Sequence, residues 1–168
     1  MKTKVKIMKN NSWDELYTPN ESIEMLIPFI PKNIKTIWEC TDYGSSNITS
    51  VLIENGYNVI TSHIKDEKDF LNYEPDEYEM IITNPPYSIK DKFLERGFEL
   101  GKPFMFLLPI TTLEGMKRGR MFKLNKIQVL IPNTRFNFLK EKSGSWFQTS
   151  WFCYGCNFLD DLNFIKIK

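Results

Sequence analysis

The sequence lacks any apolar run of the roughly 20 residues that a membrane-spanning helix needs. Its first residues, MKTKVKIMKNNSWDE, also lack the apolar segment of a signal peptide. Neither sign of charge is in excess, because the net charge is only +1. These absences predict a cytoplasmic protein with no membrane contact. They also exclude a global positive field, so any contact with nucleic acid must be local.

Cysteine and histidine are scarce. Three cysteines, an odd number, argue against a disulfide framework and fit a reducing compartment. Cys153 and Cys156 form one C-x-x-C, but a structural zinc usually has four ligands, and only Cys40 and His63 remain elsewhere. We therefore expect no metal site. SWFCYG is instead interpreted as an aromatic-rich buried strand in which Cys153 is a small apolar residue.

What the sequence does contain is typical of one globular domain. Of its 168 residues, 42% are hydrophobic and 26% are charged, which is enough apolar material for a real core. No internal repeat, low-complexity tract or long linker interrupts the chain. The sequence therefore predicts a single domain over residues 1–168.

The stretch YTPNESIEMLIPFIP carries the signals of a helix start. Thr18 is a candidate N-cap, Pro19 suits the first helical position, and Glu21 would complete a capping box. Apolar residues then recur at helical spacing, at Ile23, Leu26, Ile27 and Ile30. These signals predict a helix over about residues 19–29.

Strand and helix signals alternate along the middle of the chain. The strand candidates are KTIWEC, YNVITSHI, DEYEMIIT and KPFMFLLPI. The helix candidates are residues 47–55, closed by Gly56, and KDKFLERGFEL, closed by Gly101. This alternation predicts an α/β, Rossmann-like domain whose mostly parallel sheet has helices on both faces.

The last third of the chain is richer in β signals. KIQVLIP, TRFNFL and SWFCYGC are β-prone, and KEKSGS is a turn candidate between the last two. We therefore expect the sheet to finish with a C-terminal antiparallel hairpin and to end at about Asn157.

Ligands of such a sheet bind at the carboxyl ends of its strands, where the loops CTDYGSS, HIKDEKDF, NPPYS and PITTLEG are expected. Two prolines hold residues 84–86 extended and donate no N–H, so the carbonyls of this segment stay free to accept. Asn84 adds a side-chain acceptor, and Tyr87 adds a flat ring. Such a set suits an exocyclic amine on a planar ring, for example the N6 of adenine. The alternative is that the prolines only end the strand.

Two carbonyl acceptors would also activate such an amine. Its lone pair is delocalised into the ring, which makes the nitrogen a poor nucleophile. Acceptors placed for the tetrahedral geometry localise that lone pair and favour the transition state over the ground state. No strong base is required.

Over most of its length the sequence resembles the small N6-adenine methyltransferases, including those encoded by bacteriophages. NPPY resembles their catalytic tetrapeptide, which implies that Asn84, Pro85, Pro86 and Tyr87 hold and stack the target base. SWFCYG resembles a late strand of the same fold. The resemblance implies a Rossmann-like methyltransferase domain and direct methyl transfer from S-adenosylmethionine to DNA. A duplex substrate would have to expel its base from the stack.

The resemblance also implies a set of cofactor-binding residues. YTP resembles the segment against the methionine part, WECTDYG stands in the place of the first cofactor loop, and DF resembles the pair that binds the cofactor adenine. The residues carried over are Tyr17, Thr18, Pro19, Glu39, Asp42, Gly44, Asp69 and Phe70. His63 stands where such enzymes usually carry an acidic residue for the ribose hydroxyls, and it is either a replacement or a surface residue. Asp66 is an alternative for that role.

The sequence leaves several alternatives for the acceptor and the partners. NPPY also occurs in methyltransferases that act on RNA adenines or on glutamine amides of proteins. The single glycine of the first loop and His63 instead suit a non-catalytic binding module with a degenerate cofactor site. No separate domain for target recognition is expected, so specificity would come from loops or from a partner protein. A basic cluster is either a phosphate-contacting patch or a solvated face, and it consists of Lys117, Arg118, Arg120, Lys123 and Lys126. If the chain is phage-encoded, it acts in the host cytoplasm.

Overall fold

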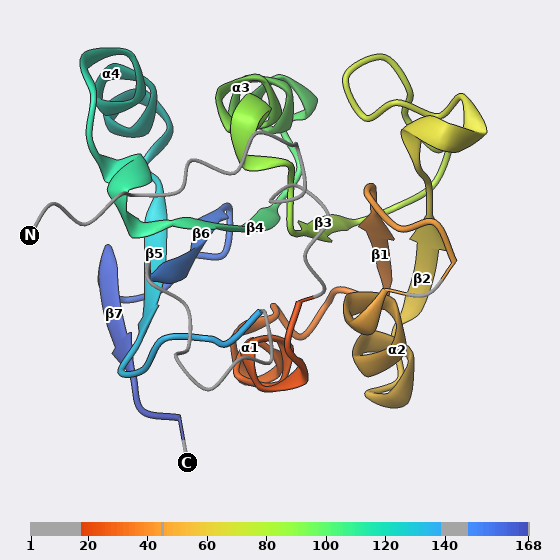
Figure 1. Cartoon of the computed structure of the whole chain (residues 1–168), viewed down its shortest axis with the longest axis horizontal. Helices are drawn as coiled ribbons and strands as arrows, with labels where there is room; N and C mark the ends of the chain where they lie inside the picture. The colour runs from red at the N-terminus through yellow and green to blue at the C-terminus, as the bar shows by residue number, and fades with distance from the viewer. Residues whose placement is uncertain (1–17, 45, 139–147, 168) are drawn as a thin grey trace, which may run out of the picture.

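The computed structural model describes residues 18–44, 46–138 and 148–167 (Figure 1). They form a seven-stranded sheet in the order β2-β1-β3-β4-β6-β5-β7. The strands are β1 Thr36–Glu39, β2 Asn58–Thr61, β3 Met80–Thr83, β4 Phe104–Pro109, β5 Gln128–Pro132, β6 Thr149–Tyr154 and β7 Leu162–Ile165.

Helices cover both faces of this sheet, as the alternating pattern predicts. The α-helices are α1 Asn20–Glu24, α2 Asn47–Glu54, α3 Lys90–Leu100 and α4 Met116–Asn125. Short 3₁₀ helices are η2 Ile27–Phe29, η3 Ile64–Asp66, η4 Tyr87–Ile89 and η5 Ile110–Leu113. Figure 1 shows α1 and α2 on one face and α3 and α4 on the other. In the parts of the chain that the structure describes, no helix is both long and apolar enough to cross a membrane.

The strands β2, β1, β3 and β4 run parallel to their neighbours. Successive side chains of these strands point to opposite faces. Ile37 and Met80 therefore join the core beneath α1 and α2, while Trp38 and Ile81 join the aromatic-rich core beneath α3. All four residues of β3 are buried, which explains why its sequence is an uninterrupted apolar run rather than an alternating one.

The end of the sheet is antiparallel, as expected, but its strand partners differ from the prediction. β6 pairs antiparallel with β4 on one side and with β5 on the other. Residues 134–138 of the TRFNFL segment form no strand, and Phe136 and Phe138 are buried in the core instead. The predicted KEKSGS turn lies outside the described residues.

The prediction that the sheet ends at about Asn157 is wrong, because β7 follows and pairs parallel with β5. Only four residues long, β7 lies at an edge of the sheet and is incompletely buried. It therefore lacks the continuous apolar run that identified the central strands β3 and β4.

The first helix is shorter than predicted, and its N-cap is Pro19 rather than Thr18. No side chain caps this helix, so the predicted capping box is absent. The α-helix ends at Glu24 and the chain continues as the 3₁₀ helix η2, which contains Pro28. A proline cannot donate the N–H that would continue the α-helical ladder back to residue 24, which accounts for the change. Thr18 is left to make contacts elsewhere.

Candidate active site

A cavity of about 330 Å³ lies at the carboxyl ends of β1 and β3. These two strands are neighbours in the sheet, and the chain leaves β1 for β2 on one side before it returns to β3 on the other. Such a reversal of strand order is where open α/β sheets form a crevice. The lining includes eight of the residues predicted for the site, namely Thr18, Glu39, Asp42, His63, Asp69, Phe70, Asn84 and Pro86.

Four further predicted residues do not line the cavity, although each directly precedes or follows a lining residue in the sequence: Pro19, Gly44, Pro85 and Tyr87. Tyr17 lies outside the described residues. The sequence reasoning missed some lining residues, among them Thr41, Asn47, Ile89 and Phe93. Helical spacing offered a signal for two of them, because Ile89 and Phe93 are four residues apart where α3 follows the NPPY segment.

Asn84 directly follows β3, and its side chain forms a hydrogen bond with Thr18, the first residue that the structure describes. Its Nδ2 donates to the Oγ1 of Thr18 at 3.1 Å. The carbonyl of Thr18 accepts from the Nδ2 of Asn47, at the start of α2, at 2.8 Å. The Oδ1 of Asn84 is buried and has no hydrogen-bond partner among the described residues. A buried acceptor without a donor is costly, so this oxygen is suited to a ligand that brings an N–H.

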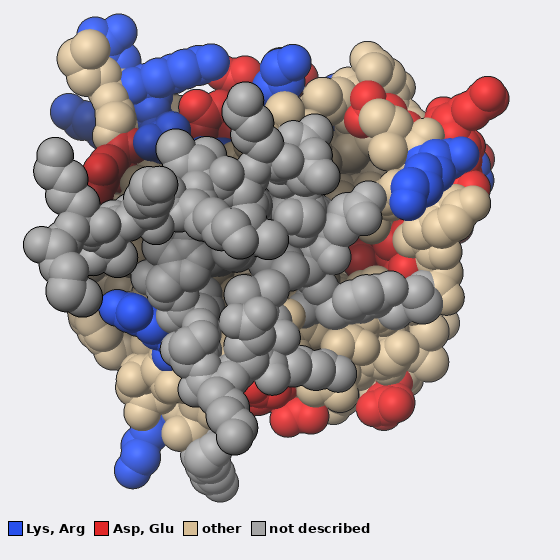
Figure 2. Space-filling view, in the orientation of Figure 1, with Lys and Arg blue, Asp and Glu red and all other residues tan. Residues whose placement is uncertain are grey.

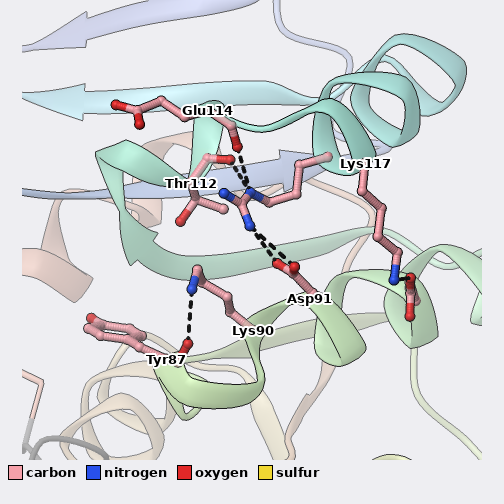
Figure 3. A network of polar contacts seen from close by, with 8 residues as sticks. Tyr87, Lys90, Asp91, Thr112, Glu114 and Lys117 are labelled. Carbon is pink, nitrogen blue, oxygen red and sulfur yellow. Dashed lines mark hydrogen bonds and ion pairs between the residues drawn. The ribbon is translucent and has the colours of Figure 1, made fainter.

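The other residues of the NPPY segment shape the same corner. Pro85 is buried, and Pro86 lines the cavity with a near-polyproline backbone (φ −56°, ψ 120°). Tyr87 begins η4, and its carbonyl accepts from the Nζ of Lys90 at 3.1 Å (Figure 3). The ring of Tyr87 is partly buried against the aromatic-rich core. The position of the segment is thus fixed by the packing of Tyr87 on the core and by the hydrogen bond from Lys90 of α3.

A buried carboxyl group ties the ends of β1 and β3 together. Glu39 is 1% exposed, and its Oε1 accepts from the Oγ1 of Thr83 at 2.6 Å and from the N–H of Thr41 at 3.0 Å. The two threonine hydroxyl oxygens lie 2.7 Å apart. Burial raises the pKa of Glu39 above its usual value, and the hydrogen bond from Thr83 opposes that shift in part. This network fixes the first loop relative to the residue that precedes Asn84.

Asp42 shapes the first loop through its own hydrogen bonds. Its Oδ1 accepts from the N–H groups of Gly44 at 2.7 Å and Ser46 at 3.0 Å, and its Oδ2 accepts from the hydroxyl of Thr49 at 2.6 Å. Gly44 has a φ of +101°, a conformation that only glycine adopts at little cost. The conformation of the loop therefore depends on one glycine and one carboxylate. Asp42 contributes to the cavity mainly by fixing the backbone of the loop that lines it.

His63 follows β2 and lies at the cavity, as expected for the residue at that strand end. Its Nδ1 accepts from the N–H of Lys65 at 3.1 Å, so in the neutral ring the proton is on Nε2. The ring also packs on Tyr43, with the centroids 5.4 Å apart. Asp66, the alternative acidic residue, is exposed and does not line the cavity.

Asp69 and Phe70 lie together at another wall of the cavity. The Oδ1 of Asp69 accepts from the N–H of Leu71 at 3.1 Å, which fixes the carboxylate. Phe70 is 1% exposed and stacks on Phe93, with the ring centroids 4.6 Å apart and an interplanar angle of 19°. This wall is therefore apolar and rigid, with one carboxylate at its edge.

The basic cluster maps to α4 and to Lys126, the C-cap residue that follows it, and Figure 2 shows Lys and Arg side chains gathered over that corner of the molecule. Lys117 forms an ion pair with Glu95 of α3. Arg118 pairs with both carboxylate oxygens of Asp91 at 3.0 and 3.2 Å. Its Nε also donates to the carbonyls of Thr112 and Glu114, each at 2.8 Å (Figure 3). Arg118 therefore fastens α4 to the start of α3.

Four members of the basic cluster, Lys117, Arg120, Lys123 and Lys126, are exposed to solvent.

No protein-family model and no curated protein match the chain. Several solved structures share its fold. The methyltransferase subunit of a type I restriction-modification system from Streptococcus thermophilus has a TM-score of 0.54 and 14% identity, over 89% of this chain and 46% of that one. A protein from Listeria monocytogenes, described as a class I S-adenosylmethionine-dependent methyltransferase, has a TM-score of 0.56 and 13% identity, over 90% of this chain and 65% of that one. A predicted O-methyltransferase from Agrobacterium tumefaciens has a TM-score of 0.52 and 8% identity, over 89% of this chain and 85% of that one.

These likenesses establish the fold. The chain shares its α/β fold with proteins described as S-adenosylmethionine-dependent methyltransferases. Its cavity lies at the carboxyl ends of the strands, where open α/β sheets in general bind ligands. The chain spans less than two thirds of the length of the first two proteins.

Proposed function

We propose that this protein is a methyltransferase that transfers a methyl group from S-adenosylmethionine to the N6 amine of adenine in DNA. The observation that carries the proposal is the Oδ1 of Asn84, a buried acceptor without a donor among the described residues, at the wall of the cavity. The chemistry of the NPPY segment, which suits a planar amine, supports the same reading.

The residues around the cavity fit the proposed cofactor. A volume of about 330 Å³ is within the range of small-molecule sites, and the walls combine apolar rings with a few fixed polar groups. Asp69 would hold the adenine amine beside Phe70, His63 would meet the ribose, and Thr18 would lie against the methionine part. When bound, the cofactor supplies a methyl group on a positively charged sulfur, which makes that carbon electrophilic.

Residues of this chain would prepare the acceptor nitrogen. The Oδ1 of Asn84 and the carbonyl of Pro85 would each accept one N–H of the amine and draw the nitrogen toward tetrahedral geometry. The lone pair is then available for attack, and the charge that develops on nitrogen is stabilised by the two oxygens. As the nitrogen took the methyl group, the bond from that carbon to sulfur would break with its electron pair left on the sulfur. The nitrogen would then release one proton to water, so no basic side chain is required. Tyr87 would stack on the base.

DNA as the acceptor is supported by the exposed cations of α4 and by the fold shared with a restriction-modification subunit. Arg118 anchors α4 to α3, directly after the NPPY segment, so the exposed cations Arg120 and Lys123 are carried on a helix fixed next to the proposed acceptor site. A base in a duplex would be flipped out to reach Asn84.

A second candidate acceptor is the side-chain amide of a protein glutamine. It is favoured by the pairing of Lys117 with Glu95 and of Arg118 with Asp91, which neutralises two members of the basic cluster. The net charge of +1 points the same way. An amide nitrogen is planar like the adenine amine, so the same two oxygens would serve it.

The test is transfer of a radiolabelled methyl group to double-stranded DNA, single-stranded DNA, total RNA and a protein extract, with cofactor binding measured in parallel by calorimetry. The proposal expects cofactor binding and label in DNA, recovered as N6-methyladenine after digestion. Label in protein alone would identify the second candidate. Cofactor binding without label in any acceptor, or no binding, would contradict the proposal of an active enzyme.

A further inference from the structure

The first turn of α3 carries a lysine beside the NPPY segment. Lys90 is the first residue of this helix, and its Nζ donates to the carbonyl of Tyr87 at 3.1 Å. Figure 3 shows the side chain turned back toward Tyr87. A lysine ammonium has three N–H groups, so this hydrogen bond leaves two of them for other acceptors. The cation of Lys90 is therefore held next to the residue proposed to stack on the target base.

Lys90 differs from the neighbouring cations in what it pairs with. Arg118 forms an ion pair with Asp91, and Lys117 forms one with a second carboxylate of α3. Among the described residues, the hydrogen-bond partner of Lys90 is a neutral carbonyl, and no carboxylate forms an ion pair with it. The carboxylate of the next residue, Asp91, is already used by Arg118. The charge of Lys90 is therefore available to an anion from outside the chain.

The position of Lys90 does not favour the stability of α3. The N-terminus of a helix is the positive end of its dipole, where an acidic side chain is favourable and a cation is unfavourable. Asp91 meets this preference and Lys90 opposes it. Lys90 is also only partly exposed, and a charge that is removed from water without a counter-charge is costly. An anion bound beside Tyr87 would relieve both costs.

We propose that Lys90 binds a phosphate next to the target adenine, so that the acceptor is a nucleotide within a DNA strand. This inference rests on the proposed function. One sugar joins a base to its phosphates, so a base stacked on Tyr87 would bring a phosphate close to the Nζ of Lys90. A glutamine side chain brings no such anion. The contact would position the flipped nucleotide, whatever the sequence around it.

Substitutions of Lys90 separate its charge from its hydrogen bond. Lys90→Gln loses the charge but keeps an N–H that can donate to the carbonyl of Tyr87, whereas Lys90→Arg keeps the charge. Lys92→Gln is the matched control, because Lys92 is exposed on the same helix and residues two apart do not face each other.

The first measurement is the affinity for DNA by fluorescence anisotropy over a range of salt concentrations. Lys90→Gln should weaken binding by roughly fivefold and reduce the slope of log affinity against log salt by about 0.9. Lys90→Arg and Lys92→Gln should stay within about twofold of the wild type.

The second measurement tests the phosphate itself. Around an adenine that the wild type methylates, each phosphate of the duplex is replaced in turn by an uncharged methylphosphonate. At one of these positions the replacement should slow methylation by the wild type by roughly fivefold. The same replacement should not slow Lys90→Gln further, because the contact is already lost in that variant.

Equal effects of every methylphosphonate on the wild type and on Lys90→Gln would overturn the inference and leave the proposed methyl transfer standing. A Lys90→Gln variant with the affinity and salt dependence of the wild type would also overturn it, because Lys90 would then act only through its hydrogen bond to Tyr87. A wild type that forms N6-methyladenine in no DNA would contradict the proposed function and, with it, this inference.

Discussion

The hydroxyl oxygen of Thr18 lies 3.1 Å from the Nδ2 of Asn84 and accepts its hydrogen bond. This hydrogen bond sets the orientation of the amide, and Oδ1 is the end that is buried without a partner among the described residues. Thr18 is itself held by Asn47, whose Nδ2 donates to its carbonyl. The residue predicted as a helix cap is therefore the residue that orients the proposed catalytic amide.

Removing this hydroxyl should slow transfer without dismantling the site. Thr18→Val keeps the shape of the side chain but loses one hydrogen bond of about 1 kcal/mol, so we expect kcat to fall by roughly fivefold. The KM for the acceptor should change less than kcat, because the group acts on the orientation of Asn84. Thr18→Ser retains the hydroxyl and should restore most of the rate. Full activity in Thr18→Val would show that Asn84 does not depend on this contact.

Asp69 is predicted to bind the cofactor. Asp69→Ala would leave the adenine amine of the cofactor unpaired in the cavity, which costs about 1–3 kcal/mol and should raise the dissociation constant measured by calorimetry. Asp66→Ala is the matched control, because Asp66 is exposed and does not line the cavity. Equal effects of the two substitutions would remove the role assigned to Asp69.

Glu39 should make the stability of the protein depend on pH. Burial raises its pKa in the folded state above the usual 4.5, so the folded protein holds the proton more tightly than the unfolded chain does. The contribution of Glu39 to stability is therefore greatest below pH 4.5 and is lost as the pH rises through the raised pKa. Glu39→Gln cannot titrate. Denaturant unfolding over this range should show the wild-type free energy of unfolding falling with pH relative to the variant, and a constant difference would contradict the account.

The cations of α4 should divide into a structural and a surface group. Arg118→Ala removes charged hydrogen bonds to Asp91 and to two carbonyls, and should lower the free energy of unfolding by about 1–2 kcal/mol. Lys123→Ala should leave stability unchanged and, if α4 meets phosphates, weaken DNA binding and its salt dependence. Unaltered DNA binding by Lys123→Ala and Arg120→Ala together would exclude the phosphate-contacting patch.

The central part of the fold was predictable from the sequence because its signals are local. The apolar runs of β3 and β4 indicate buried strands, and the glycine after α3 indicates the end of a helix. Each of these signals lies within a few residues of the sequence. The cavity was predictable for the same reason, since the ends of parallel strands meet at one edge of a sheet.

The features that escaped prediction depend on tertiary contacts. Thr18 has the sequence of an N-cap, but its hydroxyl is used by Asn84, 66 residues away. Arg118 belongs to a basic cluster in the sequence, yet Asp91 of another helix neutralises it. β7 depends on its pairing with β5 rather than on a pattern of its own.

Asn84 is the central residue of the account, and its replacement tests it most directly. The measurement is the amount of N6-methyladenine formed in unmethylated DNA by the wild-type protein and by Asn84→Ala, with cofactor affinity measured on both. The account predicts N6-methyladenine with the wild type, none above background with the variant, and closely similar cofactor affinities. An Asn84→Ala variant that methylates DNA as fast as the wild type would contradict it.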